Sequence, residues 1–326
     1  MSVRLVRPVR ILRILLLVFA AAAALSCTQQ KGPKAAETAY VRGGGVALRD
    51  QLGPSSTQSE TLKGGEKVEV LSKRTRWVQV RLDTGRTGWV HSRFLASPEV
   101  YEQFQHLSDQ TRSLPSQGKA LIRWDANLHL EPGSDTDTFY RLTEREEVDV
   151  LQHRVVEKMA PKKNDSEESA SDNEISDVQV GVNEDWLLVR SSGRAGWLRE
   201  NYVDMNPPLD IARYNEGLKI RAWFVLYEEH DNGETHPWYL WATMRPHAGL
   251  PFDFDEIRVF VWNPAKSRYE TSYRERHLIG FYPIQVTTRQ TPEGTVPAFA
   301  LEVEDATGKR LQKRYSMQGR LVKSES

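Results

Sequence analysis

Few residues in this 326-residue chain have the types and spacing that catalysis or metal binding requires. The single cysteine, Cys27, excludes an internal disulfide, a zinc site built from clustered thiolates and an iron–sulfur centre. The sequence contains no His-Glu-x-x-His zinc motif and no Gly-x-Ser-x-Gly nucleophile elbow. Isolated histidines such as His247 and His277, and acids such as Asp253 and Asp255, specify no reaction. We therefore expect a binding protein without a cofactor rather than an enzyme.

One polar stretch has the residue types of a metal site. His230 and His236 lie around one predicted turn, together with the carboxylates of Glu228, Glu229 and Glu234. Hairpin loops are usually polar, so a solvated turn explains the same residues. We expect the solvated turn and predict no metal ligand.

The tryptophans are better candidates for a functional role. In the segment 77–80, alternation places Val78 and Val80 on one face and Trp77 on the other. If the valines fill a core, the indole of Trp77 stays outside, where it can stack on a peptide or a sugar. The same alternation predicts an exposed Trp186. The predicted ligand-binding residues are Trp77, Trp89, Trp186, Trp197, Tyr40 and Trp124. The alternative is that the tryptophans simply cap small cores.

Charge and length limit the class of protein further. Lys+Arg and Asp+Glu both number 44, whereas a nucleic-acid binder normally has a basic excess, so no nucleic-acid partner is expected. The length suggests two or three domains. Residues 1–26 begin with a basic leader and continue into an unbroken apolar run at 14–25. That run fits a secretory signal, whose apolar part has about 7 to 15 residues, and is too short to span a bilayer.

Cys27 directly follows this run, in the segment Ala24-Leu25-Ser26-Cys27. The segment resembles the lipobox of bacterial lipoproteins, although that family usually has leucine where Ala24 stands. The resemblance implies that the Cys27 thiol carries a diacylglyceryl group and that the chain is held on a membrane. Ordinary cleavage, which would give a soluble protein, and an uncleaved anchor are the alternatives. Residues 27–37 are polar and are expected to form a flexible tether.

An internal repeat is the most informative feature of the sequence. Five blocks recur in order, so that residues 62–71 match 142–151 and residues 85–90 match 193–198. Each block alternates apolar and polar residues over four to six positions, which indicates short, half-buried strands. Five such strands predict a small, strongly bent antiparallel barrel. The second copy has an insertion between Leu151 and Trp186.

Both copies resemble bacterial Src-homology-3-like (SH3b) domains. The resemblance rests on a Leu-x-x-Gly-x-x-Val-x-Val-Leu block, a Trp-Val-x-Val strand and a Gly-Arg-x-Gly-Trp-Val segment, and it covers residues 38–97 and 118–204. The second copy departs from it at Glu144-Arg145, where the first has Gly64-Gly65. The resemblance implies a cell-wall peptide or a protein ligand in the grooves of the barrels.

Two segments interrupt the repeat. Residues 98–117 are predicted to form a helical linker, because Ser97 and Pro98 are a helix cap and a first-turn proline. Apolar residues at helical spacing favour packing between the barrels over a frayed linker. The acidic insertion at about 157–180 has too little apolar surface to fold, so we expect disorder. It lacks the glycine and the spacing of a calcium loop.

After Pro207-Pro208, residues 209–326 are predicted to form a third domain. Seven candidate strands, among them 268–272 and 284–288, predict a β-sandwich or a small barrel, so the whole chain is expected to be mainly β. The sequence thus predicts a lipid-anchored bacterial envelope protein that faces the periplasm. Thr28 is not the aspartate associated with inner-membrane retention, which favours the outer membrane. The expected partners are the membrane and a peptidoglycan peptide or envelope protein. An adaptor in an envelope assembly, or a wall hydrolase whose catalytic domain is the C-terminal one, are the alternatives.

Overall fold

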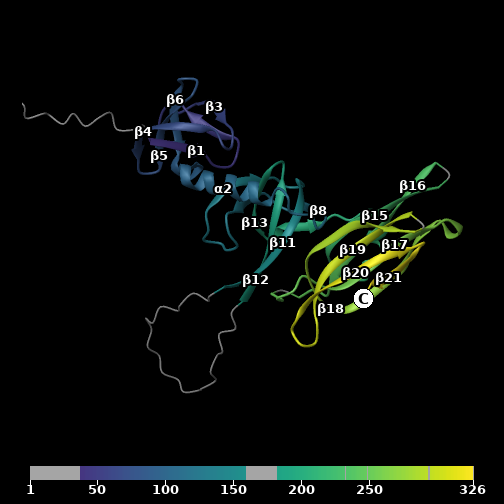
Figure 1. Ribbon diagram of the computed structural model, residues 1–326. Helices are drawn as coiled ribbons and strands as arrows, with labels where there is room; N and C mark the ends of the chain where they lie inside the picture. The colour runs from purple at the N-terminus through teal and green to yellow at the C-terminus, as the bar shows by residue number, and fades with distance from the viewer. Residues whose placement is uncertain (1–36, 159–181, 232, 248, 293, 326) are drawn as a thin grey trace, which may run out of the picture.

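A computed structural model describes residues 37–158, 182–231, 233–247, 249–292 and 294–325. The predicted signal peptide, residues 27–36 of the tether with Cys27, and most of the acidic insertion lie outside the described residues. Glu37, predicted to end the tether, is instead the first residue of a strand, where it pairs with Val70. The described part is mainly β and forms three sheets that follow one another along the molecule (Figure 1). None of its helices is long and apolar enough to cross a membrane.

The first sheet curls around its own apolar core and is called the first barrel here. Its strand order is β3-β2-β6-β5-β4-β1-β7. Val41, Leu48, Leu62, Val80 and Val90 are fully buried within it, as the alternation of their strands requires. The strands are β1 (Glu37–Val41), β2 (Val46–Arg49), β3 (Gln58–Leu62), β4 (Lys67–Arg74), β5 (Trp77–Leu82), β6 (Thr87–His91) and β7 (Leu95–Ala96).

The second sheet, called the second barrel, has the corresponding order β10-β9-β13-β12-β11-β8-β14. The two barrels therefore share one topology. Their repeated Gly-Trp pair has a steric cause, since an added Cβ would lie 2.6 Å from Leu48 at Gly88 and 2.6 Å from Leu128 at Gly196. The strands are β8 (Lys119–Ile122), β9 (Ala126–His129), β10 (Thr138–Leu142), β11 (Glu147–Lys158), β12 (Val182–Ser191), β13 (Arg194–Arg199) and β14 (Val203–Met205).

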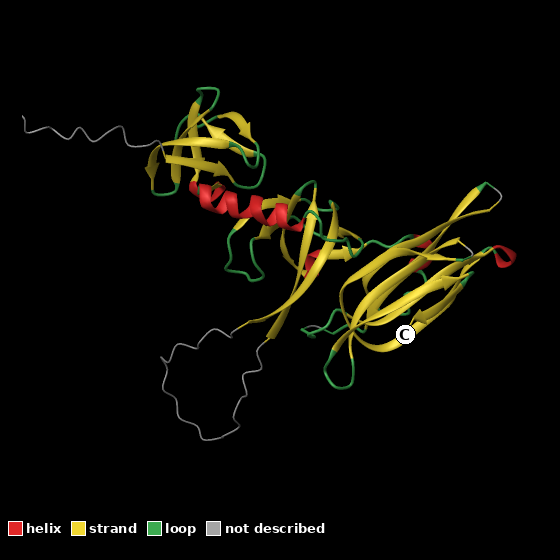
Figure 2. Cartoon of the chain, viewed as in Figure 1, coloured by secondary structure: helices red, strands yellow, loops and turns green. Residues whose placement is uncertain are grey.

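The hairpin of β11 and β12 extends beyond the barrel. Pairing continues out to Lys158 and Val182, as the two long arrows in Figure 2 show. Residues 157 and 158, predicted to belong to a disordered insertion, are therefore strand. The correction has a local cause: both have a partner on β12, so their backbone groups are satisfied as in the rest of the ladder.

Helix α2 (Pro98–Thr111) joins the barrels. It starts where the sequence predicts, and the Ser97 side chain accepts a hydrogen bond from the Val100 N–H. Phe104 is fully buried in the core of the second barrel. Tyr101 stacks on Tyr40 of the first barrel, with ring centroids 4.0 Å apart. The helix thus packs against both barrels.

The C-terminal sheet runs as a meander, in the order β15 to β21, so each strand pairs with its sequence neighbours. Short helix α3 (Leu209–Ala212) precedes it and contributes the fully buried Ile211 to a cluster with Trp241 and Phe260. The strands are β15 (Lys219–Asp231), β16 (Glu234–Met244), β17 (Phe254–Asn263), β18 (Arg268–Thr291), β19 (Gly294–Glu304), β20 (Arg310–Gln318) and β21 (Leu321–Glu325).

Strand β18 makes this sheet into two layers. Residues up to Gly280 pair with β17, and residues from Gly280 onward pair with β19. An added Cβ at Gly280 would lie 2.1 Å from the ring of Phe254, so the turn between the layers needs glycine. Side chains of both layers meet in one core. The sequence predicted two separate strands, 268–272 and 284–288, where the structure has this one continuous strand.

Polar contacts join the second barrel to the C-terminal domain. Gln117 is fully buried and accepts hydrogen bonds from the N–H groups of Trp223, 3.0 Å, and Ile284, 2.8 Å. His153 of β11 lies between two carboxylates, with Nε2 2.9 Å from Asp185 and Nδ1 2.7 Å from Asp253. Because these partners come from both domains, the contacts fix the two domains relative to each other.

The outward-facing side of the second barrel is covered. Trp186, Leu188 and Trp197 are only 1, 2 and 4% exposed. They form a cluster with Leu151, against which Leu107 of α2 and Leu114 pack. The predicted exposure of Trp186 is therefore wrong. Alternation does place it outside the barrel core, but the indole is buried in this cluster, with the His129 ring centroid 5.1 Å and the Arg199 guanidinium 5.7 Å from its own centroid.

We predict that Trp186→Ala lowers the free energy of unfolding by about 3 to 5 kcal/mol, because it leaves a cavity in this cluster. Urea unfolding followed by circular dichroism measures the loss. Trp124→Ala is the control in the same barrel, since that side chain is 55% exposed, and it should change stability by less than about 1 kcal/mol. Equal unfolding midpoints for the two variants would contradict the burial of Trp186.

A second prediction concerns pH. Burial alone would raise the pKa of Asp185, but hydrogen bonds from His153 and from the Gly249 N–H outweigh it and hold the pKa below its ordinary value of 3.8. The ionised carboxylate therefore contributes stability that is complete above this value and is lost as the pH falls through the lower, folded-state pKa. Unfolding free energies measured from pH 6 to pH 2.5 should fall less steeply in Asp185→Asn. If the unfolding free energy of the wild type and of Asp185→Asn falls in parallel with pH, the proposed contribution of the Asp185 carboxylate is refuted.

Candidate functional site

The first barrel has an aromatic surface, which we call the outer face. It consists of Arg49, Arg74, Trp77, Gln79, Trp89 and His91. Cross-strand pairing brings these residues together. Between β5 and β6, Trp77 lies opposite His91 and Gln79 lies opposite Trp89. Arg49 of β2 lies on the other side of Trp89. Val78 and Val80, on the other side of β5, are 5 and 0% exposed. The outer face is thus the side of the sheet turned away from the barrel core.

Contacts within the outer face hold the rings in place without burying them. Trp77 and His91 meet edge to face with centroids 5.4 Å apart. The guanidinium of Arg74 lies 5.4 Å from the Trp89 ring centroid. Both indoles remain partly exposed. A ligand that reaches this surface meets indole planes next to cationic groups, an arrangement suited to stacking on a peptide and pairing with its carboxylates.

The second barrel has the same cross-strand geometry, but the indoles of Trp186 and Trp197 are buried. Trp186 lies opposite Arg199, and Leu188 lies opposite Trp197. These four positions correspond to the four outer-face positions on β5 and β6. The difference between the copies is that Leu188 stands where the first copy has Gln79. An apolar residue on the outward side of a strand indicates that something packs there, and this signal was present in the sequence.

The remaining candidates lie apart from the outer face. Tyr40 is half-buried against Tyr101 of α2. Trp197 is covered and has the Arg154 guanidinium 5.1 Å from its centroid. Trp124 is exposed and meets Tyr202 edge to face at 6.0 Å. Of the six predicted residues, the structure therefore brings only Trp77 and Trp89 together on an accessible surface.

The predicted polar turn in the C-terminal domain is the hairpin of β15 and β16. His236 stacks on Trp262 with centroids 4.1 Å apart, and the ring of His230 contacts the Thr235 hydroxyl at 3.0 Å. Across the ranges that the structure describes, no group of three or more His, Cys, Asp and Glu side chains is placed to hold a metal ion.

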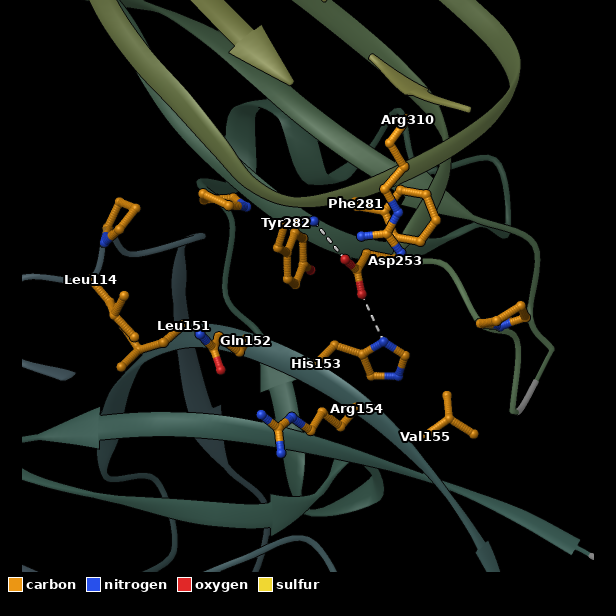
Figure 3. A pocket seen from close by; sticks show the side chains of 13 residues that line it. Leu114, Leu151, Gln152, His153, Arg154, Val155, Asp253, Phe281, Tyr282 and Arg310 are labelled. Carbon is orange, nitrogen blue, oxygen red and sulfur yellow. Dashed lines mark hydrogen bonds and ion pairs between the residues drawn. The ribbon is translucent and has the colours of Figure 1, made fainter. Parts of the chain in front are cut away.

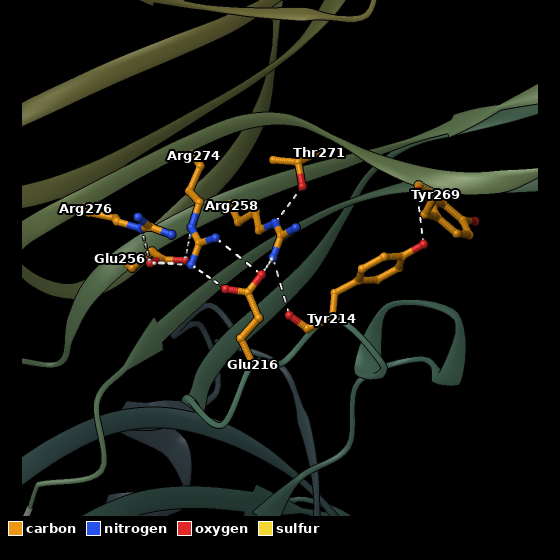
Figure 4. A network of polar contacts seen from close by, with 8 residues as sticks. All are labelled: Tyr214, Glu216, Glu256, Arg258, Tyr269, Thr271, Arg274 and Arg276. Carbon is orange, nitrogen blue, oxygen red and sulfur yellow. Dashed lines mark hydrogen bonds and ion pairs between the residues drawn. The ribbon is translucent and has the colours of Figure 1, made fainter. Parts of the chain in front are cut away.

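A second polar cluster lies on β17 and β18 (Figure 4). Arg258 and Arg274 both bond to Glu216, and Arg274 also bonds to Glu256 together with Arg276. Each carboxylate therefore has two arginine partners, and together they hold the turn before β15 against the sheet. The pKa of Glu216 is lowered chiefly by its hydrogen bond with Arg274. We interpret this cluster as structural.

His153 is the buried histidine that sequence reasoning missed. Figure 3 shows it on β11, directed at Asp253 of the C-terminal domain. Its side chain is 3% exposed. His153 and Asp253 lie 100 positions apart, so no local pattern indicates their contact. Because both ring nitrogens face carboxylates, neither is free to activate a nucleophile. The arrangement positions the two domains rather than forming a catalytic dyad.

Comparison with known proteins agrees with the topology of the first barrel. A family model described as a bacterial SH3 domain matches residues 44–96. No curated protein matches the chain. Among solved structures, NlpC2 from Trichomonas vaginalis is similar at 10% identity, over 88% of this chain and 100% of that one, with a TM-score of 0.18.

Two further solved structures are similar at the same level. An NlpC/P60 family protein from Bacillus cereus has 12% identity, over 72% of this chain and 93% of that one, with a TM-score of 0.22. NlpC1 from Trichomonas vaginalis has 10% identity, over 92% of this chain and 91% of that one, with a TM-score of 0.17. The family match and the strand order together show that residues 44–96 form a bacterial SH3 domain.

Proposed function

We propose that the chain is an exported, lipid-anchored protein of the bacterial cell envelope that binds a cell-wall peptide or a protein ligand and catalyses no reaction. The outer face of the first barrel is the proposed binding surface. Its partly exposed indoles, Trp77 and Trp89, are the observation that carries the proposal. Peptidoglycan is the proposed ligand, and the outer membrane, on its periplasmic side, is the proposed location.

The contrast between the two barrels supports a single binding surface. The second sheet has the same strand order, and we propose that it is a second SH3-like domain. Its indoles, Trp186 and Trp197, are covered, so it offers no equivalent surface. We propose that the second barrel connects the first barrel to the C-terminal domain and that ligand binding belongs to the first barrel.

The charge of the outer face indicates the chemistry of the ligand. Two of its six residues are arginines, Arg49 and Arg74, and none is acidic. The Arg49 guanidinium donates to the Ser56 hydroxyl at 3.2 Å, and Arg74 lies on the Trp89 ring. Carboxylates of a peptide are the complementary groups for such guanidinium ions. The proposed ligand is therefore a peptide with free carboxylates, which peptidoglycan supplies.

The proposal of a non-catalytic protein rests on the contacts of its best candidate base. His153 has carboxylates at both ring nitrogens, as described above. A cysteine nucleophile would have to be Cys27, for which we propose lipid attachment instead.

Sedimentation with insoluble peptidoglycan tests the binding surface. The wild-type chain should co-sediment, and Trp77→Ala/Trp89→Ala should weaken binding about tenfold or more, because stacked aromatic residues are frequent binding hot spots. Trp124→Ala removes a more exposed indole elsewhere and should leave binding within about twofold. Equal binding by the double variant, or no binding by the wild type, would overturn the wall-binding proposal. Release of soluble muropeptides by the purified protein would contradict the absence of catalysis.

Metabolic labelling tests the lipid anchor. Cells that express the chain should incorporate radioactive palmitate into it, and Cys27→Ser should abolish the label because the thiol is the proposed attachment point. Two or more acyl chains hold a protein on a membrane stably, so the wild type should also fractionate with membranes. Label that persists in Cys27→Ser would rule out this attachment.

A further inference from the structure

Strand β11 changes from an internal strand to an edge strand along its length. Residues 147–149 pair with β8 on one side, while Asp149 and Val150 also pair with β12 on the other. The Val150 carbonyl accepts from the Gln117 N–H at 2.6 Å. From Leu151 onward, β12 is the only described strand that pairs with β11. One edge of its backbone is therefore left without a strand partner within the described structure.

This edge borders a cavity between the second barrel and the C-terminal domain. The cavity measures about 400 Å³ and is lined by all of residues 151–155. Because successive side chains of a strand point to opposite faces, five consecutive residues line one cavity when the edge of the strand faces it. The accessibility of His153 indicates that its main chain faces the cavity. Its side chain is 3% exposed, yet the residue as a whole is only partly buried, so its accessible surface lies on the main chain.

The opposite wall of the cavity comes from β18, where Phe281, Tyr282 and Pro283 turn between the two layers of the C-terminal sheet. Figure 3 shows Phe281 and Tyr282 across from the β11 residues. The slot thus has a main-chain edge on one side and ring surfaces on the other. An extended peptide fits this geometry, since it can pair with the edge through its backbone and pack its side chains on the rings.

Two arginines line the same cavity from the two domains. Arg310 of β20 lies 3.6 Å from the Phe281 ring centroid, and Arg154 of β11 lies 5.1 Å from that of Trp197. Neither forms an ion pair with a described residue. The one acid in the lining, Asp253, is already engaged, because its oxygens contact His153 and accept from the Tyr282 N–H at 2.6 Å. The cavity therefore has a surplus of positive charge.

We propose that the free edge of β11 at residues 151–155 is a strand-addition site for an extended acidic segment of a partner protein. Main-chain hydrogen bonds to the edge supply affinity, and carboxylates placed near Arg154 and Arg310 supply selectivity. The edge of five residues spans about 16 Å, which accommodates a short strand of similar length. The site is separate from the outer face of the first barrel.

The hexapeptide acetyl-Thr-Val-Asp-Val-Thr-Val-amide is a suitable probe, with a copy that has Asn in place of Asp as its neutral match. Titration of the full chain should give saturable binding with a dissociation constant below about 1 mM, and the Asn copy should bind about tenfold more weakly because the charged hydrogen bond is lost. Hydrogen exchange should slow in residues 151–155 when the acidic peptide is bound.

Variants locate the binding. Arg310→Gln should weaken binding of the acidic peptide about tenfold. The variant should then bind the acidic peptide and its Asn copy equally well. Arg314→Gln is the matched control, an exposed arginine on the same strand that does not line the cavity, and should stay within about twofold. Trp77→Ala/Trp89→Ala should retain full peptide binding, which separates this site from the wall-binding surface.

Four results would overturn the proposal. The first is the absence of saturation below 1 mM, and the second is equal binding of the two peptides. The third is protection that appears elsewhere while residues 151–155 exchange as before. Binding seen only after deletion of residues 159–181 would make that segment of the chain the occupant and would likewise refute a partner peptide.

Discussion

The packing of linker leucines on the second barrel is the contact on which the rest of the arrangement depends. Leu107 and Leu114 pack on the cluster of Leu151, Trp186, Leu188 and Trp197, which would otherwise be more open to water. Burial of apolar surface stabilises a fold by about 25 cal/mol per Å². The free energy gained by burying this cluster offsets the conformational entropy lost when the short linker is ordered. The same helix also stacks Tyr101 on Tyr40 of the first barrel. One apolar contact region therefore both orients the first barrel and buries the outward-facing indoles of the second. Two copies of one topology thereby acquire different roles.

The junction with the C-terminal domain follows a different principle. Its central groups are polar and are removed from water, so each requires a partner, and Gln117 and His153 obtain theirs from the opposite domain. Arg221 and Glu200 form a buried ion pair across the same boundary. Such contacts specify one relative placement, because a shifted arrangement would leave charged groups buried without partners. The cavity beside β11 keeps its shape for this reason.

Much of the fold could be predicted because its causes are local. The repeat, the alternating strands, the helix start at Ser97-Pro98 and the side of the sheet that Trp77 occupies all follow from neighbouring residues. The error at Trp186 is of another kind, since alternation tells which side of a strand a residue occupies but not what later packs there. Leu188 was the available hint. The contact of His153 with Asp253 and the open edge of β11 depend on the docking of two domains, for which short-range patterns hold no information.

The shared strand β18 has a consequence for how the C-terminal domain folds. Every pairing in that sheet joins sequence neighbours, so hairpins can form one after another as the chain is synthesised. Strand β18, however, belongs to both layers, and the core closes only when β19 and β20 lay Phe299 and Tyr315 against side chains of the earlier layer. Neither layer has a complete core alone. The domain is therefore built to gain and lose its structure as one cooperative unit, although its pairings are all local.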